Sequence, residues 1–253
     1  MLRRLFAAPL SALLLMLAVA TPSQAGEVQV AVAANFAGPF ARIGEAFTAA
    51  TGHVLKVSTG STGKFHTQII SGAPFEVLVS ADDETPRRLV SDGHAIAGTS
   101  FTYALGRLVL WSAQPGLVDD KGAVLSSGRL RHVAIANPKV APYGAAAMEV
   151  IKAMGLTESL RPRLVTGESI SQAYQFVATG NADVGFVAFS QVVVPGRPPA
   201  GSYWAVPTSL YGEIRQDAVL LKAGAGNPAA RALLDYLKSE PARRVMREFG
   251  YGL

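Results

Sequence analysis

Apolar residues along the chain fall into short buried runs that alternate with segments of helical periodicity. The runs are too short to be helices by themselves, and the segments between them place apolar residues three or four positions apart, as Phe40, Ile43 and Phe47 do. Strands are predicted at 28–33, 53–58, 75–80, 103–112, 131–136, 163–165, 184–189 and 218–221, and helices at 40–50, 64–70, 84–92, 145–154, 171–179 and 228–249. This alternation predicts an α/β fold of mostly parallel sheets flanked by helices.

Two strand-like runs, near 103–112 and 215–222, lie where the chain would pass between two lobes. We therefore expect a first lobe of residues 26–106 and 217–253 and a second lobe of residues 107–216. A cleft between two such lobes is a natural binding site.

The first 25 residues have the pattern of a secretory signal peptide. Arg3 and Arg4 precede an apolar stretch, and Ser23-Gln24-Ala25 supplies small residues for cleavage after Ala25. A membrane anchor fits less well, because the apolar stretch is short and contains Pro9. The chain has no cysteine, which excludes disulfides, thiolate catalysis, zinc–thiolate sites and a lipid anchor on an N-terminal cysteine. A periplasmic protein is expected.

Charge changes the picture little once the leader is removed. The chain has 253 residues, of which 16% are charged, and a formal net charge of +5. Residues 1–25 contain two arginines and no acids, so the mature chain carries +3. The basic residues are scattered, whereas nucleic-acid binding needs a concentrated basic face. No nucleic-acid partner is expected.

Four junctions from strand to helix carry the candidate chemistry. They are Ala33-Ala34-Asn35-Phe36, Gly60-Ser61-Thr62-Gly63-Lys64, the segment 137–144, and Gly167-Glu168-Ser169-Ile170-Ser171. Each junction taken alone is explained as a helix cap. Because parallel strands end at one edge of a sheet, the four helix N-termini are expected to converge, and free N–H groups there favour an anion. A fully ionised tetrahedral dianion fits such neutral donors.

Sequence motifs for nucleotide hydrolysis and for serine catalysis are incomplete or absent. Residues 58–65 are similar to a P-loop, but Ser58 replaces its first glycine and Phe65 its metal-binding hydroxyl residue. No G-x-S-x-G elbow occurs, and the four histidines are isolated. The acids 82–84 are best explained as a solvated helix start.

At these junctions the sequence resembles the periplasmic molybdate-binding proteins of ABC importers, over most of the mature chain. The strings that carry the resemblance are Ala34-Asn35-Phe36, Gly60-Ser61-Thr62-Gly63, Gly72-Ala73-Pro74-Phe75-Glu76-Val77, Ser80-Ala81-Asp82, Phe101-Thr102-Tyr103-Ala104, Pro142-Tyr143-Gly144 and Gly185-Phe186-Val187. The resemblance implies a two-lobed type II periplasmic binding protein.

It also implies the ligand set. The common branch has serine at the positions of Asn35 and Thr62, and the side chains of both residues can still donate. It has valine at the position of Ile170, whose backbone N–H matters more than its side chain. That branch has a tyrosine at the position of Ala188, which has no hydroxyl to offer, and alanine where this chain has Tyr143. Tyr143 is therefore expected to supply the hydroxyl from another helix start. The expected ligand residues are Ala34, Asn35, Ser61, Thr62, Tyr143 and Ile170.

The resulting hypothesis is a monomeric, high-affinity molybdate and tungstate receptor that serves the membrane permease of an ABC importer. It is expected to be neither an enzyme nor a cofactor protein, and to hold metal only as the oxyanion. Two alternatives remain. A receptor for sulfate or phosphate would need a buried acid in the cleft if its ligand were protonated. A serine hydrolase built on Ser61, Ser169 or Ser171 would need a histidine within hydrogen-bond reach.

Overall fold

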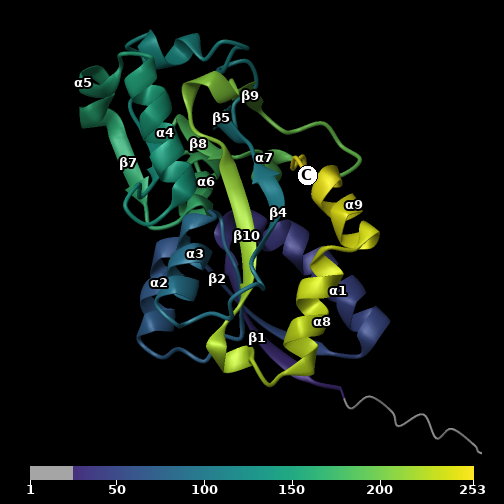
Figure 1. Cartoon of the computed structure of the whole chain (residues 1–253). Coiled ribbons are helices and arrows are strands. Elements are labelled where there is room, and N and C mark those ends of the chain that lie inside the picture. Colours follow the sequence, from purple (N-terminus) through teal and green to yellow (C-terminus); the bar gives the residue numbers. More distant parts are fainter. Residues whose placement is uncertain (1–24) are drawn as a thin grey trace, which may run out of the picture.

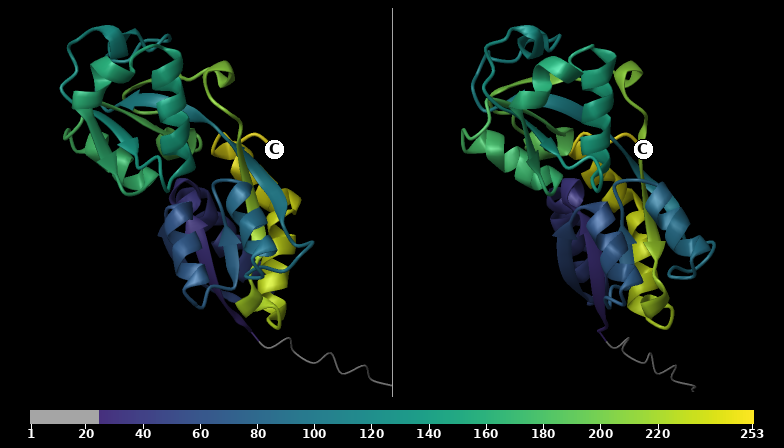
Figure 2. Two further views of the ribbon diagram at one scale, coloured as in Figure 1. Left: turned by 60° about the vertical axis from the view of Figure 1, so that its left-hand side comes forward. Right: turned by 90° about the vertical axis from the view of Figure 1, so that its left-hand side faces the viewer.

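The structure, a computed structural model, describes residues 25–253. The predicted signal peptide lies outside the described residues except for Ala25. The described chain forms two lobes, each built around a five-stranded sheet, as Figures 1 and 2 show. The predicted α/β class is confirmed.

The first sheet has the order β2-β1-β3-β10-β4. Its strands are β1 (Glu27–Ala33), β2 (Val54–Gly60), β3 (Val77–Val79), β4 (Phe101–Gly106) and β10 (Ile214–Leu220). β1 pairs in parallel with β2 and β3, whereas β10 is antiparallel to both of its neighbours. Four strands thus run one way and β10 runs the other.

The second sheet repeats this arrangement in the order β7-β6-β8-β5-β9. Its strands are β5 (Leu108–Ser112), β6 (Val133–Ala136), β7 (Leu164–Gly167), β8 (Val184–Ala188) and β9 (Ser202–Ala205). β6 pairs in parallel with β7 and β8, and β5 is antiparallel to β8 and β9. In each sheet the antiparallel strand, β10 or β5, is thus the first strand that the chain forms after it crosses from the other lobe.

Helices cover both faces of the first sheet. On one face α1 (Ala37–Thr51), α8 (Pro228–Leu237) and α9 (Glu240–Glu248) bury Phe40, Leu233 and Met246 against the valines of β1. On the other face α2 (Thr62–Ile70) and α3 (Glu84–Ser91) bury Phe65 and Leu89. The second sheet packs against α4 (Pro142–Ala153) and α6 (Ile170–Ala178), and two short helices, α5 (Thr157–Leu160) and α7 (Phe189–Val192), complete that lobe.

The passage between the lobes differs in detail from the prediction. The single run expected at 103–112 is two strands, because pairing changes from one sheet to the other at Arg107, between β4 and β5. The return was expected after residue 216, but β10 pairs with the first sheet from Ile214 onward. β9 was not predicted at all.

Several helices begin earlier than predicted, and this brings the junctions into their first turns. α2 begins at Thr62 instead of 64, and α4 begins at Pro142 instead of 145, where a proline suits the first position because its missing N–H is not needed. A 3-10 turn (Ala34–Phe36) leads into α1. Gly52 terminates α1, with a φ of 76° that favours glycine.

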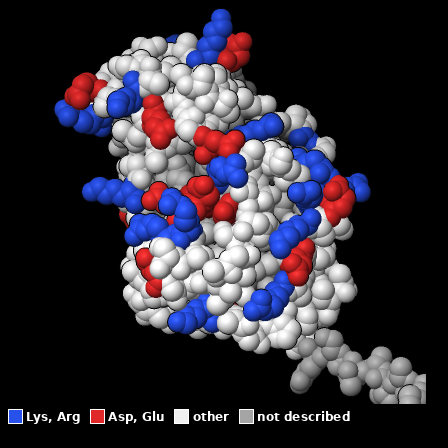
Figure 3. All heavy atoms as spheres, viewed as in Figure 1, with Lys and Arg blue, Asp and Glu red and all other residues white. Residues whose placement is uncertain are grey.

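Charged side chains of both signs are interspersed over the face in Figure 3, which agrees with the scattered charge of the sequence. Within residues 25–253, no helix combines the length and the apolar character needed to cross a bilayer. The same residues contain no cluster of histidines and carboxylates arranged to hold a metal ion.

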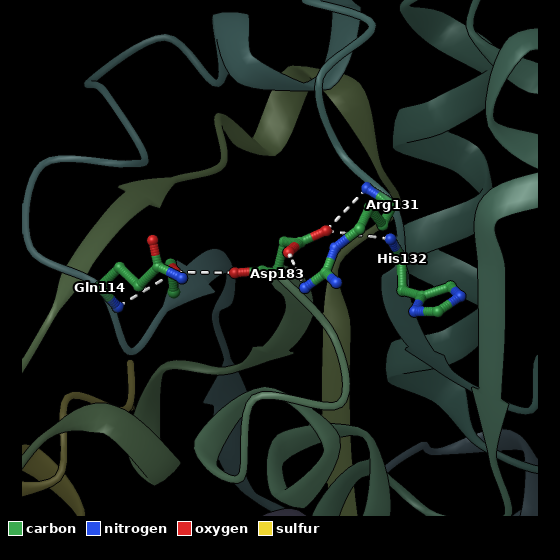
Figure 4. A network of polar contacts seen from close by, with 5 residues as sticks. Gln114, Arg131, His132 and Asp183 are labelled. Atoms are coloured by element: carbon green, nitrogen blue, oxygen red, sulfur yellow. Dashed lines mark hydrogen bonds and ion pairs between the residues drawn. The ribbon is translucent and has the colours of Figure 1, made fainter.

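Asp183 ties the start of β6 to the start of β8. Its carboxylate accepts from the backbone N–H groups of Arg131 at 2.7 Å and His132 at 3.1 Å, and its carbonyl accepts from Ser112 (Figure 4). Burial raises the pKa of the Asp183 carboxyl, but the hydrogen bonds from His132 and Arg131 and the Arg131 charge outweigh it, so the pKa lies below its usual range.

We expect Asp183→Ala to lower the free energy of unfolding by about 1–3 kcal/mol at neutral pH. Because the folded pKa is lowered, this stability is present above the unfolded pKa of about 3.9 and is lost as the pH falls through the folded value. Urea denaturation at several pH values checks this. Asp235→Ala, which removes a carboxylate that is 77% exposed, is the matched control and should change little.

Candidate functional site

The four predicted junctions meet at one small cavity between the lobes. All six predicted ligand residues line it: Ala34, Asn35, Ser61, Thr62, Tyr143 and Ile170. The remaining lining residues are Ala33, Gly60, Ala81, Ala141 and Pro142. The cavity holds about 10 Å³, and its polar lining residues are 1–4% exposed.

Backbone donors come from the helix starts. Thr62 and Ile170 are the first residues of α2 and α6, and Ala34 opens the 3-10 turn before α1. The N–H groups of a first turn have no acceptor within their own helix, and they carry the positive end of the helix dipole. The cavity thus has donors from both lobes, because α2 and α1 belong to the first lobe and α6 to the second.

Among residues 25–253, no charged side chain lines the cavity. A ligand that carries a proton is bound best where a carboxylate accepts that proton, and the lining residues supply no carboxylate. Hydroxyl and N–H donors without a countercharge suit an anion that is fully deprotonated.

The Ser61 hydroxyl is the least satisfied polar group of the cavity. Ser61 is 4% exposed and precedes α2, but its Oγ makes neither a capping bond nor any other hydrogen bond among residues 25–253. A buried hydroxyl without a partner costs free energy, so it is rare in a native protein and calls for an explanation. A ligand oxygen in the cavity would provide the missing acceptor.

The other side-chain donors differ in their availability. Thr62 Oγ1 accepts from the N–H of Ala81 at 3.0 Å, which leaves its own proton for another acceptor. Tyr143 Oη accepts from Gln216 at 2.9 Å and likewise retains its proton. Asn35 was expected to donate to the ligand through its side chain. Its Nδ2, however, already donates to Gln216 at 2.8 Å and to Tyr251 at 3.0 Å. The Asn35 backbone N–H is therefore its available donor.

Sequence reasoning missed the residues behind the cavity. Gln216, Tyr103, Tyr251 and Ser190 are buried and form the hydrogen-bond network on which Asn35 and Tyr143 rest. Tyr251 lies beyond α9, near the C-terminus, where no local sequence pattern links it to the junctions. The only sequence signal at this position is an aromatic residue next to the C-terminus. In the structure Tyr251 is buried, and the C-terminus lies beside α7 (Figure 1).

The two lobes touch around the cavity. The N–H of Gly63 donates to the carbonyl of Val140 at 2.9 Å, and the Lys64 ammonium lies 2.8 Å from the Glu168 carboxylate. A Cβ on Gly63 would lie 2.8 Å from the Cα of Val140, so only glycine permits this approach. Residues of both lobes therefore line the cavity and hold it narrow where the lobes touch.

A larger cleft of about 600 Å³ adjoins the cavity and shares Ala81, Ala141 and Pro142 with it. It contains the acidic residues Asp82, Asp83 and Glu84, which the sequence placed at a solvated helix start. Burial raises the pKa of the Asp82 carboxyl, although its bonds to Thr85 and Ser80 oppose this.

The three serines of the hydrolase alternative lack a base. Ser61 Oγ has no partner, Ser169 Oγ accepts from Gln172 N–H, and Ser171 Oγ donates to the carbonyl of Ala34. Within the described chain no histidine is hydrogen-bonded to any of them, so the pairing that activates a serine is missing.

We expect anion affinity to be insensitive to phenol ionisation between about pH 7 and pH 10, the usual tyrosine pKa. Burial, reinforced by the neighbouring Tyr251, holds the pKa of Tyr143 well above that value. Deprotonation would remove a donor and place a negative charge against the ligand, so the raised pKa moves this loss to higher pH. Titration calorimetry across this range is the check. A fall in affinity centred near pH 10 would contradict the expectation.

Comparison with known proteins places the chain in a defined context. The family model for bacterial extracellular solute-binding proteins matches residues 28–252. The molybdate-binding protein ModA of Azotobacter vinelandii is 57% identical over 235 residues, 93% of each chain, and that of Rhodobacter capsulatus is 57% identical over 241 residues, 95% of this chain and 94% of the other. The structure of an Azotobacter vinelandii periplasmic molybdate-binding protein superposes with a TM-score of 0.87 at 40% identity, covering 89% of this chain and 99% of that one.

Proposed function

The chain belongs to the family of bacterial extracellular solute-binding proteins, and from this premise we propose that it binds molybdate in the cavity between its lobes. The bound anion is delivered to the membrane permease of an ABC importer. The protein acts as a monomeric periplasmic receptor and not as an enzyme. The names of its relatives, at 57% identity, support molybdate as the ligand.

The observation that carries the proposal is the unpartnered Ser61 hydroxyl in a cavity lined by neutral donors. In this proposal, Ser61, Thr62 and Tyr143 donate through their hydroxyls. Ala34, Asn35 and Ile170 donate through backbone N–H groups. Tyr143 takes the place of the hydroxyl that Ala188 does not have.

The number of hydrogen-bond donors in the cavity is sufficient for tight binding. Nanomolar affinity requires about 12 kcal/mol. Five to seven charge-assisted hydrogen bonds at about 1.5–3 kcal/mol each supply this, after the cost of association is subtracted. Tungstate has nearly the size and charge of molybdate, and we propose that it binds comparably.

A thermal-shift panel on the mature protein, refolded to remove any bound anion, tests the proposal. Molybdate and tungstate should raise the melting temperature, because a ligand that binds only the folded state stabilises it by mass action. Sulfate, which is smaller, and phosphate, which carries a proton at neutral pH, should raise it much less. A larger shift with sulfate or phosphate than with molybdate would refute molybdate as the ligand.

A further inference from the structure

A row of buried amides and hydroxyls lies behind the cavity and joins Asn35 to Tyr143. Asn35 Nδ2 donates to Gln216 Oε1 at 2.8 Å, and Gln216 Nε2 donates to Tyr143 Oη at 2.9 Å. Gln216 is 0% exposed and is absent from the cavity lining. It can therefore affect a ligand only through the residues it touches.

The direction of these hydrogen bonds is set at the backbone carbonyl of Asn35, which can only accept. The hydroxyls of Ser190 and Tyr251 lie 2.8 Å and 2.9 Å from that oxygen and donate to it. A tyrosine hydroxyl has one proton, so the Tyr251 oxygen then accepts from Asn35 Nδ2. The Asn35 amide is thereby oriented with its N–H groups toward Tyr251 and Gln216.

The orientation passes through Gln216 to the cavity. Because Asn35 presents an N–H, Gln216 turns its carbonyl oxygen toward Asn35 and its amide nitrogen toward Tyr143. The Tyr143 oxygen is then occupied as an acceptor from the amide. The Tyr143 proton is not used in this bond, and in the proposal made below it is directed at the cavity that Tyr143 lines.

The local backbone makes room for this contact. The pairing of β10 with β4 shifts register between Gln216 and Asp217, and such bulges redirect side chains. On β4, a Cβ at Gly106 would lie 2.5 Å from Gln216 Nε2 and would also collide with the Tyr143 hydroxyl. A bulge on one strand and a glycine on the next thus create the space in which the amide meets the phenol.

We propose that Gln216 is a positioning residue that makes Tyr143 an obligatory donor to the ligand, so that the site selects fully deprotonated oxyanions over protonated ones. This inference rests on the proposed function, because it takes molybdate as the ligand. An O–H of hydrogen phosphate that faced Tyr143 would meet the Tyr143 proton. Two donors facing each other leave both unpaired, which is costly in a buried site.

A double-mutant cycle tests the action of Gln216 through Tyr143. Gln216→Met, of similar length, should weaken molybdate binding about tenfold, the size of one hydrogen bond to a charged group. Gln216→Met should also lower the ratio of molybdate affinity to phosphate affinity. In a Tyr143→Phe background the same change should cost almost nothing more, because the hydroxyl that it orients is gone.

Ser112→Ala is the matched control. Ser112 is buried and donates to the carbonyl of Asp183 at 2.7 Å, away from the cavity, so its loss should lower stability and leave affinity unchanged. Additive effects of Gln216→Met and Tyr143→Phe on affinity would overturn the inference. Failure of the wild-type protein to bind molybdate would instead overturn the proposed function, and the inference with it.

Gln216→Glu provides a second test within one folded protein. A protonated glutamate keeps one acceptor and one donor, as glutamine does, whereas the ionised form only accepts and draws the Tyr143 proton away from the cavity. We expect affinity to be reduced about a hundredfold or more at about pH 8 and to recover toward the wild-type value near pH 5.5, since burial raises a carboxyl pKa. A deficit that does not change with pH would contradict the inference, including in the case where Gln216→Met does not fold.

Discussion

Replacing Gly63 by alanine should weaken molybdate binding by about ten- to a hundredfold while stabilising the unliganded protein. The added Cβ would lie 2.8 Å from the Cα and 2.9 Å from the Cβ of Val140, which belongs to the other lobe. Overpacking of this kind costs about 1–3 kcal/mol. The cost falls on the closed arrangement alone, because no contact with Val140 exists when the lobes are apart.

The opposite effect on stability comes from the helix. Gly63 lies in the first turn of α2, where alanine is favoured over glycine by about 1 kcal/mol. Calorimetric titration and thermal melting of the unliganded protein measure the two effects separately. Gly38→Ala is the matched control, since Gly38 lies in α1 and a Cβ there would meet only Phe249, at 3.6 Å. Unchanged affinity in Gly63→Ala would show that this contact is not needed for binding.

Ser61→Ala should also act in opposite directions on binding and on stability. Loss of one hydrogen bond to a charged ligand should weaken molybdate binding by about 1.5–3 kcal/mol. The unliganded protein should be as stable as the wild type or more stable, because the hydroxyl is buried without a partner and caps no helix N–H. Affinity and urea stability of the two proteins provide the comparison.

Ser239 offers a control for this variant. Its Oγ is likewise buried without a hydrogen-bond partner among residues 25–253, but it precedes α9 and does not line the cavity. Ser239→Ala should leave molybdate affinity unchanged. If Ser61→Ala binds molybdate as tightly as the wild type, the Ser61 hydroxyl does not contact the ligand. The unpartnered Ser61 hydroxyl then no longer supports the proposed function.

The sequence predicted the convergence of the four junctions because the rule behind it is general. In parallel sheets the carboxyl ends of the strands share an edge, so Ser61 and Ile170 approach each other although they belong to different lobes. The resemblance to a known family suggested Tyr143 as a substitute donor, and the structure places Tyr143 in the lining of the cavity.

What the sequence did not predict depends on long-range pairing. Gln216 meets Asn35 and Tyr143 only because β10 returns to the first sheet with a bulge at that residue. The same hydrogen bonds redirect the Asn35 side chain, which sequence alone suggested as a direct donor. Strand β9 was missed because Ser202–Ala205 is short and half-polar, and its pairing with β5 is decided by tertiary contacts.

Titration calorimetry of the mature protein, freed of bound anion, with sodium molybdate tests the central claim most directly. The account predicts one site per chain and nanomolar affinity, about 12 kcal/mol, with much weaker binding of sulfate and phosphate under the same conditions. Absence of tight molybdate binding by protein shown to be folded would contradict it.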